Sequence, residues 1–321
     1  MKTATAAPVS SRQKPSKTGS HTLRKINKYK TYYLLLILPM AYFIIFRYGP
    51  ILGNILAFRK YAPGKSVYGV AWADPIFKYF QQFLSDPSFW SAFKNTLILS
   101  GLNILISFSL PIIFAVLLNE MTHPRLRSFI QTISYFPHFI STVVVVGMIT
   151  ELLSPSTGIV NDLIVRLGGQ STFFMNEPKY FRAIYIISEI WQHLGWNSII
   201  YYAALVGIDP QLYEAAEIDG ASRLRRIFSI SIPMIAPTIA VVLVITLGSV
   251  MSLGFEKVLL MYTPSNSATS DIVDTFVYRM GIENSAYSFA SAVGLFGGII
   301  GCILVTSSNW LSRKISGESL Y

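Results

Sequence analysis

Residues 209–233, with the sequence DPQLYEAAEIDGASRLRRIFSISIP, form a polar loop between two long apolar stretches. Asp209 can cap a helix and Pro210 suits the first helical position, so a helix is predicted to begin there. Gly220 permits a sharp turn, after which a second, amphipathic helix is predicted before Pro233. The loop therefore predicts two short helices that project from a much more apolar body.

The composition of the 321-residue chain indicates what kind of protein the apolar body belongs to. Apolar residues make up 52% and charged residues only 13%, whereas an average soluble domain has roughly 25% charged residues. A soluble core cannot hide so much apolar surface. The single cysteine, Cys302, allows no internal disulfide. These features exclude a disulfide-stapled secreted module, an intrinsically disordered chain and a Cys-rich zinc protein, and they indicate a multi-spanning membrane protein.

The predicted spans are stretches of mostly uncharged residues, because one bilayer crossing needs about 20 apolar residues. Arg47 lies inside the first stretch, Glu189 interrupts the fourth, and the last two are longer than one crossing needs. Each of those two should therefore hold a turn or an interfacial segment. The predicted fold class is all-α, a polytopic membrane protein with six transmembrane helices at about 31–57, 95–119, 128–150, about 181–208, 227–255 and 284–312.

The basic residues indicate the orientation. Lys and Arg are concentrated in residues 1–30 and in the other segments on the same side of the predicted spans. The positive-inside rule then predicts that both termini lie in the cytoplasm. A cleaved signal peptide is disfavoured because no small-x-small pattern follows the first apolar run. The net charge of +10 suits anionic membrane lipids, so membrane lipids and no nucleic acid are expected as partners.

The polar loop carries a specific motif: Glu214-Ala215-Ala216, three residues, Gly220, nine residues, then Ile230-Ser231-Ile232-Pro233. It resembles the EAA loop of the membrane subunits of bacterial ABC importers, with Ile232 where that family has Leu. The resemblance implies a type I ABC importer permease (MetI-like) fold, with a coupling helix that docks on a separate ATPase. It also implies a multi-pass protein of the bacterial inner or plasma membrane. The residues implied in ATPase coupling are Glu214, Ala215, Ala216, Asp219, Gly220, Arg223, Ile230 and Pro233.

Two other interpretations of the loop are weaker. It could be an ordinary surface helix, or a DNA-binding helix-turn-helix. The second is disfavoured because the loop is tethered between two spans and has no third helix to complete a core.

The sequence shows no site for ATP hydrolysis. Gly64-Lys65-Ser66 resembles the end of a phosphate-binding loop, but Arg59 stands where the first glycine is required. We therefore expect a transport subunit and not an enzyme, with no bound cofactor or metal and with ATP and Mg used by a partner ATPase. A self-sufficient secondary transporter or an intramembrane enzyme remains the alternative.

Polar groups inside the spans are candidates for a substrate pathway, because they are costly in a membrane and usually face the bundle interior. Aromatic rings stack on the C–H faces of sugars, and amides or carboxylates bind hydroxyls. Glu256 and Lys257 are weaker candidates, and all of these residues could instead be membrane anchors or packing contacts. The candidates are Glu189, Gln192, His193, Trp196, Asn197, Tyr135, His138, Thr246 and Ser249.

Three further stretches resemble one branch of the importer permeases: Tyr48-Gly49-Pro50, Phe93 to Thr96 and Tyr135 to His138. That branch takes up carbohydrates, including complex oligosaccharides of pectin, rhamnogalacturonan or alginate type. The resemblance implies a second homologous permease subunit in a heterodimer, a dimer of a sugar-type ABC ATPase, an extracellular solute-binding lipoprotein and an oligosaccharide substrate. An importer for a non-sugar solute is the alternative within the family.

The predicted organisation follows from these assignments. It consists of a cytoplasmic basic tail with a short juxtamembrane helix (1–30), a first transmembrane helix (31–57), an extracellular loop with an interfacial helix (58–92), a permease core of five transmembrane helices (93–311) that includes the cytoplasmic coupling loop (209–233), and a cytoplasmic tail (312–321).

Overall fold

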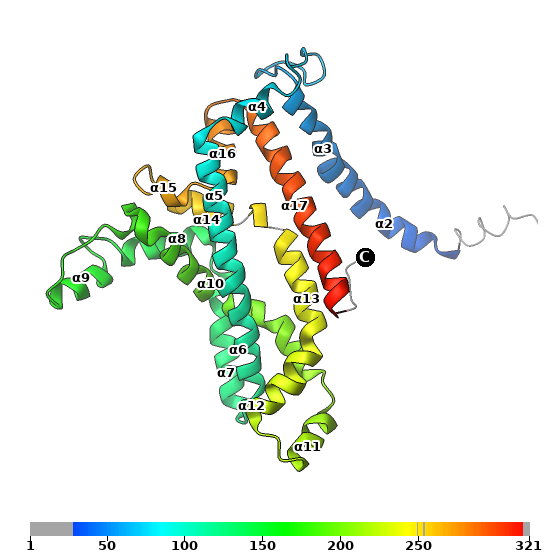
Figure 1. The fold of residues 1–321 in the computed structure, drawn as a ribbon, viewed down its shortest axis with the longest axis vertical. Helices are drawn as coiled ribbons and strands as arrows, with labels where there is room; N and C mark the ends of the chain where they lie inside the picture. The colour runs from blue at the N-terminus through cyan, green and yellow to red at the C-terminus, as the bar shows by residue number, and fades with distance from the viewer. Residues whose placement is uncertain (1–27, 249, 253, 317–321) are drawn as a thin grey trace, which may run out of the picture. The chain divides into compact units, whose positions relative to one another are not determined.

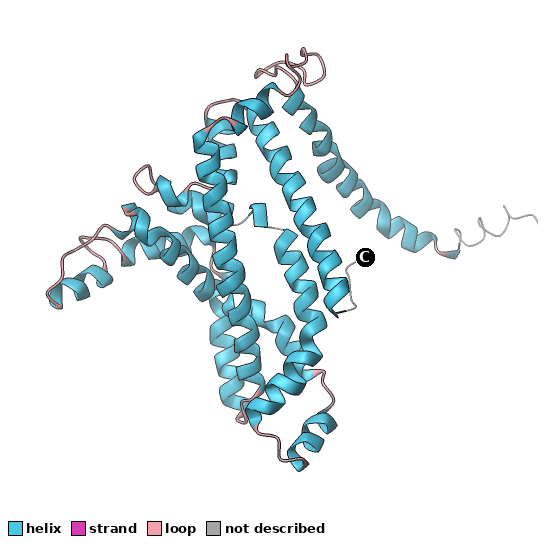
Figure 2. Cartoon of the chain, viewed as in Figure 1, coloured by secondary structure: helices cyan, strands magenta, loops and turns pink. Residues whose placement is uncertain are grey.

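The computed structural model describes residues 28–248, 250–252 and 254–316. Within these residues the chain consists of helices joined by loops and turns (Figure 2). One isolated antiparallel bridge pairs Arg59 with Trp72. The all-α prediction is therefore confirmed. The predicted juxtamembrane helix and the end of the C-terminal tail lie outside the described residues. The chain divides into two units, one ending at Ile55 and one beginning at Leu56.

The described part of the first unit is a single apolar helix. It comprises α2 (Lys30–Phe43), the π-helical segment η1 (Ile44–Tyr48) and α3 (Gly49–Gly53). Together with η2 (Asn54–Phe58) it gives 29 residues that are long and apolar enough to cross a membrane. This agrees with the predicted span at 31–57.

The second unit is a set of long helices linked by shorter ones (Figure 1). Helix α10 packs along α6, and α13 packs along α17. Before α10 the elements are α4 (Lys78–Leu84), α5 (Pro87–Leu102), η3 (Asn103–Phe108), α6 (Ser109–Asn119), α7 (Pro124–Tyr135), η4 (Phe136–Phe139), α8 (Thr142–Leu152), α9 (Ile159–Arg166) and η5 (Phe174–Asn176). From α10 onward they are α10 (Pro178–Val206), α11 (Pro210–Ile218), α12 (Arg223–Arg226), η6 (Ile227–Ser231), α13 (Ile232–Gly248), η7 (Val250–Ser252), α14 (Phe255–Met261), α15 (Ser267–Ser270), α16 (Val273–Tyr278), η8 (Arg279–Glu283) and α17 (Tyr287–Ser316).

Four helices within the described residues are long and apolar enough to span a membrane: Lys30–Phe58, Pro87–Asn119, Arg223–Gly248 and Tyr287–Trp310. A bent pair, α7 with α8, raises the number to five if it forms one span. Helix α10 has 29 residues but also carries Lys179, Arg182 and Glu189. The number of six spans therefore stays a prediction.

The stretch 128–150, predicted as one span, is not one continuous helix. It is divided between α7 and α8, which are bent by 97°. Pro137 lies in the 3-10 segment η4 between them, and Ile140 is extended. Ser141 then caps α8 by accepting a hydrogen bond from the backbone N–H of Val144. The proline and the new cap end one helix and start another in a different direction.

The two longest apolar stretches behave differently. The stretch 227–255 is interrupted, because α13 ends at Gly248 and α14 begins at Phe255, as the prediction of a turn required. By contrast, α17 is one helix from Tyr287 to Ser316, and the non-helical residues of 284–312 lie at its start, from Asn284 to Ala286. An apolar stretch can extend beyond the bilayer without a break, and length alone does not reveal this.

Three π-helical segments have a common cause in the sequence. Pro50, Pro111 and Pro233 each follow a π-helical segment, and the residue four positions earlier lies within η1, η3 or η6. Proline lacks an N–H group, and its ring clashes with the carbonyl four residues back, so the preceding turn widens. Proline positions therefore locate local widening of the long helices.

Asp274 of α16 provides a pH-dependent prediction. Burial away from water raises the pKa of this carboxyl to about 6 from its ordinary value of 3.8. The folded protein therefore holds the proton more tightly than the unfolded chain, and stability is lost as the pH rises through that interval. We expect Asp274→Asn to raise the melting temperature of the detergent-purified protein at about pH 8 and to leave it almost unchanged at about pH 4. An equal effect at both pH values would contradict the desolvation of Asp274.

Candidate functional site

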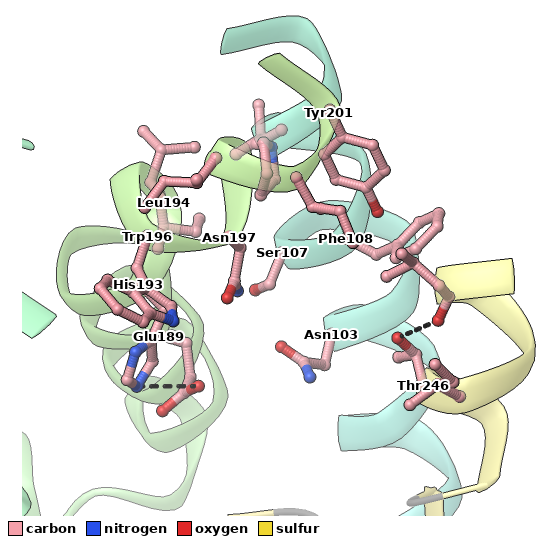
Figure 3. A pocket seen from close by; sticks show the side chains of 17 residues that line it. Asn103, Ser107, Phe108, Glu189, His193, Leu194, Trp196, Asn197, Tyr201 and Thr246 are labelled. Atoms are coloured by element: carbon pink, nitrogen blue, oxygen red, sulfur yellow. Dashed lines mark hydrogen bonds and ion pairs between the residues drawn. The ribbon is translucent and has the colours of Figure 1, made fainter. Parts of the chain in front are cut away.

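A cavity of about 680 Å³ lies between α10, the η3–α6 segment and α13 (Figure 3). Its wall combines aliphatic residues with side chains that can form hydrogen bonds. The polar and aromatic members are Asn103, Ser107, Phe108, Glu189, His193, Trp196, Asn197, Tyr201 and Thr246. A wall of this composition suits a solute with both hydroxyl groups and apolar C–H faces.

One face of α10 supplies much of this wall. Glu189, His193 and Trp196 follow one another at intervals of four and three residues, and Asn197 is adjacent, so they share one side of the helix. Thr246 faces them from α13 (Figure 3). The structure thus brings five of the nine pathway candidates together at one cavity.

The other four candidates have different positions. Gln192 is buried, and its Nε2 donates to the carbonyl of Ile140 at 3.0 Å, so it ties α10 to the bend before α8. Tyr135 and His138 lie at the end of α7 and in η4 and do not line the cavity. Ser249 lies outside the described residues.

Two hydrogen-bonding residues of the wall, an amide and a hydroxyl, were not among the candidates predicted from the sequence. Asn103 and Ser107 come from the π-helical segment η3 and point toward the cavity (Figure 3). Within the described residues, Asn103 Oδ1 and Ser107 Oγ are buried without a hydrogen-bond partner. Buried polar atoms normally have partners, so these two oxygens are unsatisfied in this conformation. The signal for them was Pro111, which follows the turn that carries both residues.

A chain of polar contacts runs from the cavity to α14. The Lys257 ammonium pairs with the Glu189 carboxylate, and only 3% of the Lys257 side chain is exposed. His193 Nε2 is 4.0 Å from the other Glu189 oxygen. His193 Nδ1 is 3.0 Å from His138 Nδ1. The His138 ring stacks on Trp196 with centroids 4.3 Å apart. His138 therefore does not line the cavity itself, but its ring holds the ring of Trp196, which does.

Gly195 sets the closeness of α10 to α7. A Cβ atom at this position would lie 2.2 Å from the carbonyl oxygen of Ser134, and a backbone atom cannot move aside as a flexible side chain can. We expect Gly195→Ala to destabilise the protein by about 1–3 kcal/mol through overpacking. The measurement is the melting temperature of the purified protein in detergent. Gly101→Ala is the control, because no heavy atom lies within 4 Å of a Cβ there; equal effects of the two substitutions would contradict the close packing.

The polar loop contains the first of its two predicted short helices. The second is not separate, because α12, η6 and α13 continue as one helix from Arg223 to Gly248. Helix α11 begins at Pro210, and the Asp209 carboxylate accepts from the backbone N–H of Gln211 at 3.0 Å. Gly220 has a φ of +75°, which favours glycine. The motif residues are distributed over Glu214, Ala215 and Ala216 in α11, Asp219 and Gly220 after it, Arg223 in α12, Ile230 in η6 and Pro233 in α13.

Two contacts tie α11 to the start of the next long helix. The Tyr213 hydroxyl and Ser231 Oγ are 2.9 Å apart, and Ser231 is buried. Arg226 Nη1 is 3.2 Å from Glu217 Oε2. Tyr213 and Glu217 belong to no motif, so the sequence alone did not single them out. A displacement of α11 would reach α13 through these contacts.

The outer face of α11 lacks a partner within the described chain. Ile218 is 88% exposed, and Leu212 is also exposed. None of the described side chains of α11 is buried. The helix therefore has the small residues and uncovered apolar groups of a surface that contacts another protein.

Known proteins resemble this chain over most of its length. Residues 107–317 match the family described as binding-protein-dependent transport system inner membrane component. The polygalacturonan/rhamnogalacturonan transport system permease protein YteP of Bacillus subtilis is 40% identical over 93% of this chain and 92% of its own length. Protein LplB of the same organism is 39% identical over 94% of this chain and 95% of its own.

A solved structure agrees with these relatives. A chain of a bacterial ABC transporter involved in the import of the acidic polysaccharide alginate matches with a TM-score of 0.85 and 39% identity, covering 92% of this chain and 99% of that one. The prediction of a transport subunit that is not itself an enzyme agrees with these matches. The chain belongs to the binding-protein-dependent transport system inner membrane component family, the permease subunits of ABC importers.

Proposed function

We propose that this chain is one permease half of an ATP-driven, binding-protein-dependent importer of oligosaccharides. The observation that carries the proposal is the presence on one chain of a polar and aromatic cavity and of a projecting helix with the EAA motif. Relatives named as polygalacturonan/rhamnogalacturonan and arabinooligosaccharide permeases support the sugar assignment.

The cavity favours a sugar for chemical reasons. Trp196 offers a ring that is already oriented by His138 and can stack on a pyranose face. Asn103, Ser107 and Asn197 offer donors and acceptors for hydroxyl groups. A sugar hydroxyl would give the unpaired Asn103 and Ser107 oxygens the hydrogen bonds that they lack within the described chain.

The lack of cationic side chains in the described part of the cavity wall limits which groups of a substrate this chain can bind. None of the described residues that line the cavity is Lys or Arg, and Lys257 is neutralised by Glu189 behind it. This half of the path therefore binds hydroxyl groups and apolar faces of the sugar. If the substrate carries carboxylates, the cations that bind them come from the second permease subunit.

The mechanism that we propose is alternating access. ATP binding closes a separate ATPase dimer, α11 moves with it, and the Tyr213–Ser231 and Arg226–Glu217 contacts carry the movement into α13, which forms part of the cavity wall. The cavity opens outward to accept sugar from an extracellular binding lipoprotein, and hydrolysis resets the inward-facing state. Coupling of this kind is a differential contact with two conformations and requires no bond-making by this chain.

The proposed arrangement places both termini and the coupling loop in the cytoplasm. The segment 58–92, with the short helix α4, then lies outside and is available to the binding lipoprotein. The chain works beside a second, homologous permease subunit. ATP and Mg are bound by the ATPase, so no cofactor is assigned to this chain.

Uptake by the reconstituted importer tests the proposal. The complex is purified, placed in proteoliposomes with its binding protein, and supplied with labelled oligosaccharides or amino acids. We expect ATP-dependent uptake of an oligosaccharide. Asn197→Ala should lower it at least about tenfold, which corresponds to roughly 1.4 kcal/mol of lost binding. Thr306→Ala, on an exposed part of α17, is the control. Uptake of amino acids alone would contradict the sugar assignment.

A further inference from the structure

A second cavity, of about 470 Å³, lies where the segment after α6 meets the coupling loop. Three of its lining residues are arginines from two different parts of the chain: Arg127 of α7, and Arg223 and Arg226 of α12. One acid, Glu120, also lines it. The cavity is therefore a basic site, separate from the cavity of the proposed pathway.

Two of these arginines have no acidic partner within the described residues. Arg226 pairs with Glu217 at 3.2 Å. Within the described residues, neither Arg127 nor Arg223 forms an ion pair. Arg127 is half-buried, so its guanidinium has only part of the hydration of a free side chain. A bound anion would supply the negative charge that is missing and accept hydrogen bonds from the N–H groups of both guanidinium ions.

The surroundings of the cavity indicate what carries that anion. Asn119 of its wall ends one candidate membrane span, and Arg223 begins another. In the proposed arrangement the cavity therefore lies at the surface of the membrane, beside the ends of two apolar helices. A phospholipid holds its phosphate group at that level of the bilayer, whereas a free phosphate is not held there.

We propose that this cavity binds the phosphate group of an anionic phospholipid. The proposal rests on the proposed orientation, which puts the coupling loop at the cytoplasmic leaflet, where anionic lipids are enriched. The lipid bridges α7 and α12 and so holds the latter at the membrane surface. Anionic lipid then supports coupling between the ATPase and the spans.

Lipid retention by paired variants tests the proposal. The importer complex is extracted from membranes that contain phosphatidylcholine and phosphatidylglycerol, and the lipids bound to this chain are counted by native mass spectrometry. The double variant R127Q/R223Q should retain about one phosphatidylglycerol fewer than the wild type. The matched control R125Q/R225Q removes the same charge from exposed arginines of the same two helices that do not line the cavity, and it should retain the wild-type number.

Two further measurements distinguish a bound lipid from other occupants of the cavity. Inorganic phosphate at millimolar concentration should leave the retained phosphatidylglycerol in place; its displacement by phosphate would overturn the lipid assignment. Equal retention by R127Q/R223Q and R125Q/R225Q would also overturn it. Loss of the ATPase from R127Q/R223Q with unchanged lipid retention would show that an acidic protein surface occupies the cavity instead. Because lipid retention is counted on this chain, its outcome is independent of whether the importer transports a sugar.

Discussion

Replacing Gly220 with valine should yield an importer that still hydrolyses ATP but takes up little sugar. Gly220 has a φ of +75°, and a β-branched residue is strained there, at a cost of about 1–2 kcal/mol. Valine should therefore redirect the chain after α11 and move the coupling helix relative to α13. We expect sugar uptake per ATP hydrolysed to fall at least about tenfold, since 1.4 kcal/mol corresponds to a factor of ten.

The control for this experiment is Gly220→Asn, because asparagine tolerates a positive φ better than other non-glycine residues. No heavy atom lies within 4 Å of a Cβ at Gly220, so either side chain has room and the comparison isolates backbone conformation. Membrane insertion, measured by the amount of folded protein, should be unchanged in both variants. Normal uptake by Gly220→Val would remove the coupling role of this turn.

Replacing Lys257 with methionine should destabilise the protein strongly. Lys257 is 3% exposed and neutralises Glu189, so its loss leaves a partly buried carboxylate without its partner. Breaking a buried ion pair on one side costs about 3–5 kcal/mol. We expect a large drop in the melting temperature of the purified protein, together with less folded protein in the membrane.

The double variant Lys257→Met/Glu189→Gln should recover most of this stability, because neither partner then carries an uncompensated charge. Uptake is not expected to recover, since Glu189 lines the cavity. The difference between the single and double variants measures the coupling of the two charges. Equal melting temperatures for the single and double variants would contradict a buried Lys257–Glu189 pair.

The local features of the coupling loop could be predicted from the sequence because they depend on near neighbours. Asp209 caps the helix that starts at Pro210, and Gly220 takes the left-handed conformation that only glycine adopts readily. The shared face of α10 follows from helical periodicity, which placed Glu189, His193 and Asn197 at one cavity.

Other features depend on parts of the chain that are distant in the sequence. The pairing of Lys257 with Glu189 joins α14 to α10, and no local pattern specifies it. Gln192 lies on the same helix as the cavity residues but packs against Ile140, because the bend after η4 brings that carbonyl close. The position of Asn103 and Ser107 on the cavity wall could be predicted only by relating Pro111 to the widened π-helical turn before it. Counting polar residues in the span does not reveal this turn.

We propose that this permease subunit works through a separate ATPase that contacts α11. The most direct test is a detergent-extracted pull-down of a tagged copy from its native cell, with every co-purifying subunit identified and a known ABC importer extracted in parallel. We expect recovery of a sugar-type ATPase and a second permease subunit with an EAA motif. Recovery of the chain alone, while the reference importer stays intact, would contradict a separate ATPase partner and favour a self-sufficient transporter or an intramembrane enzyme.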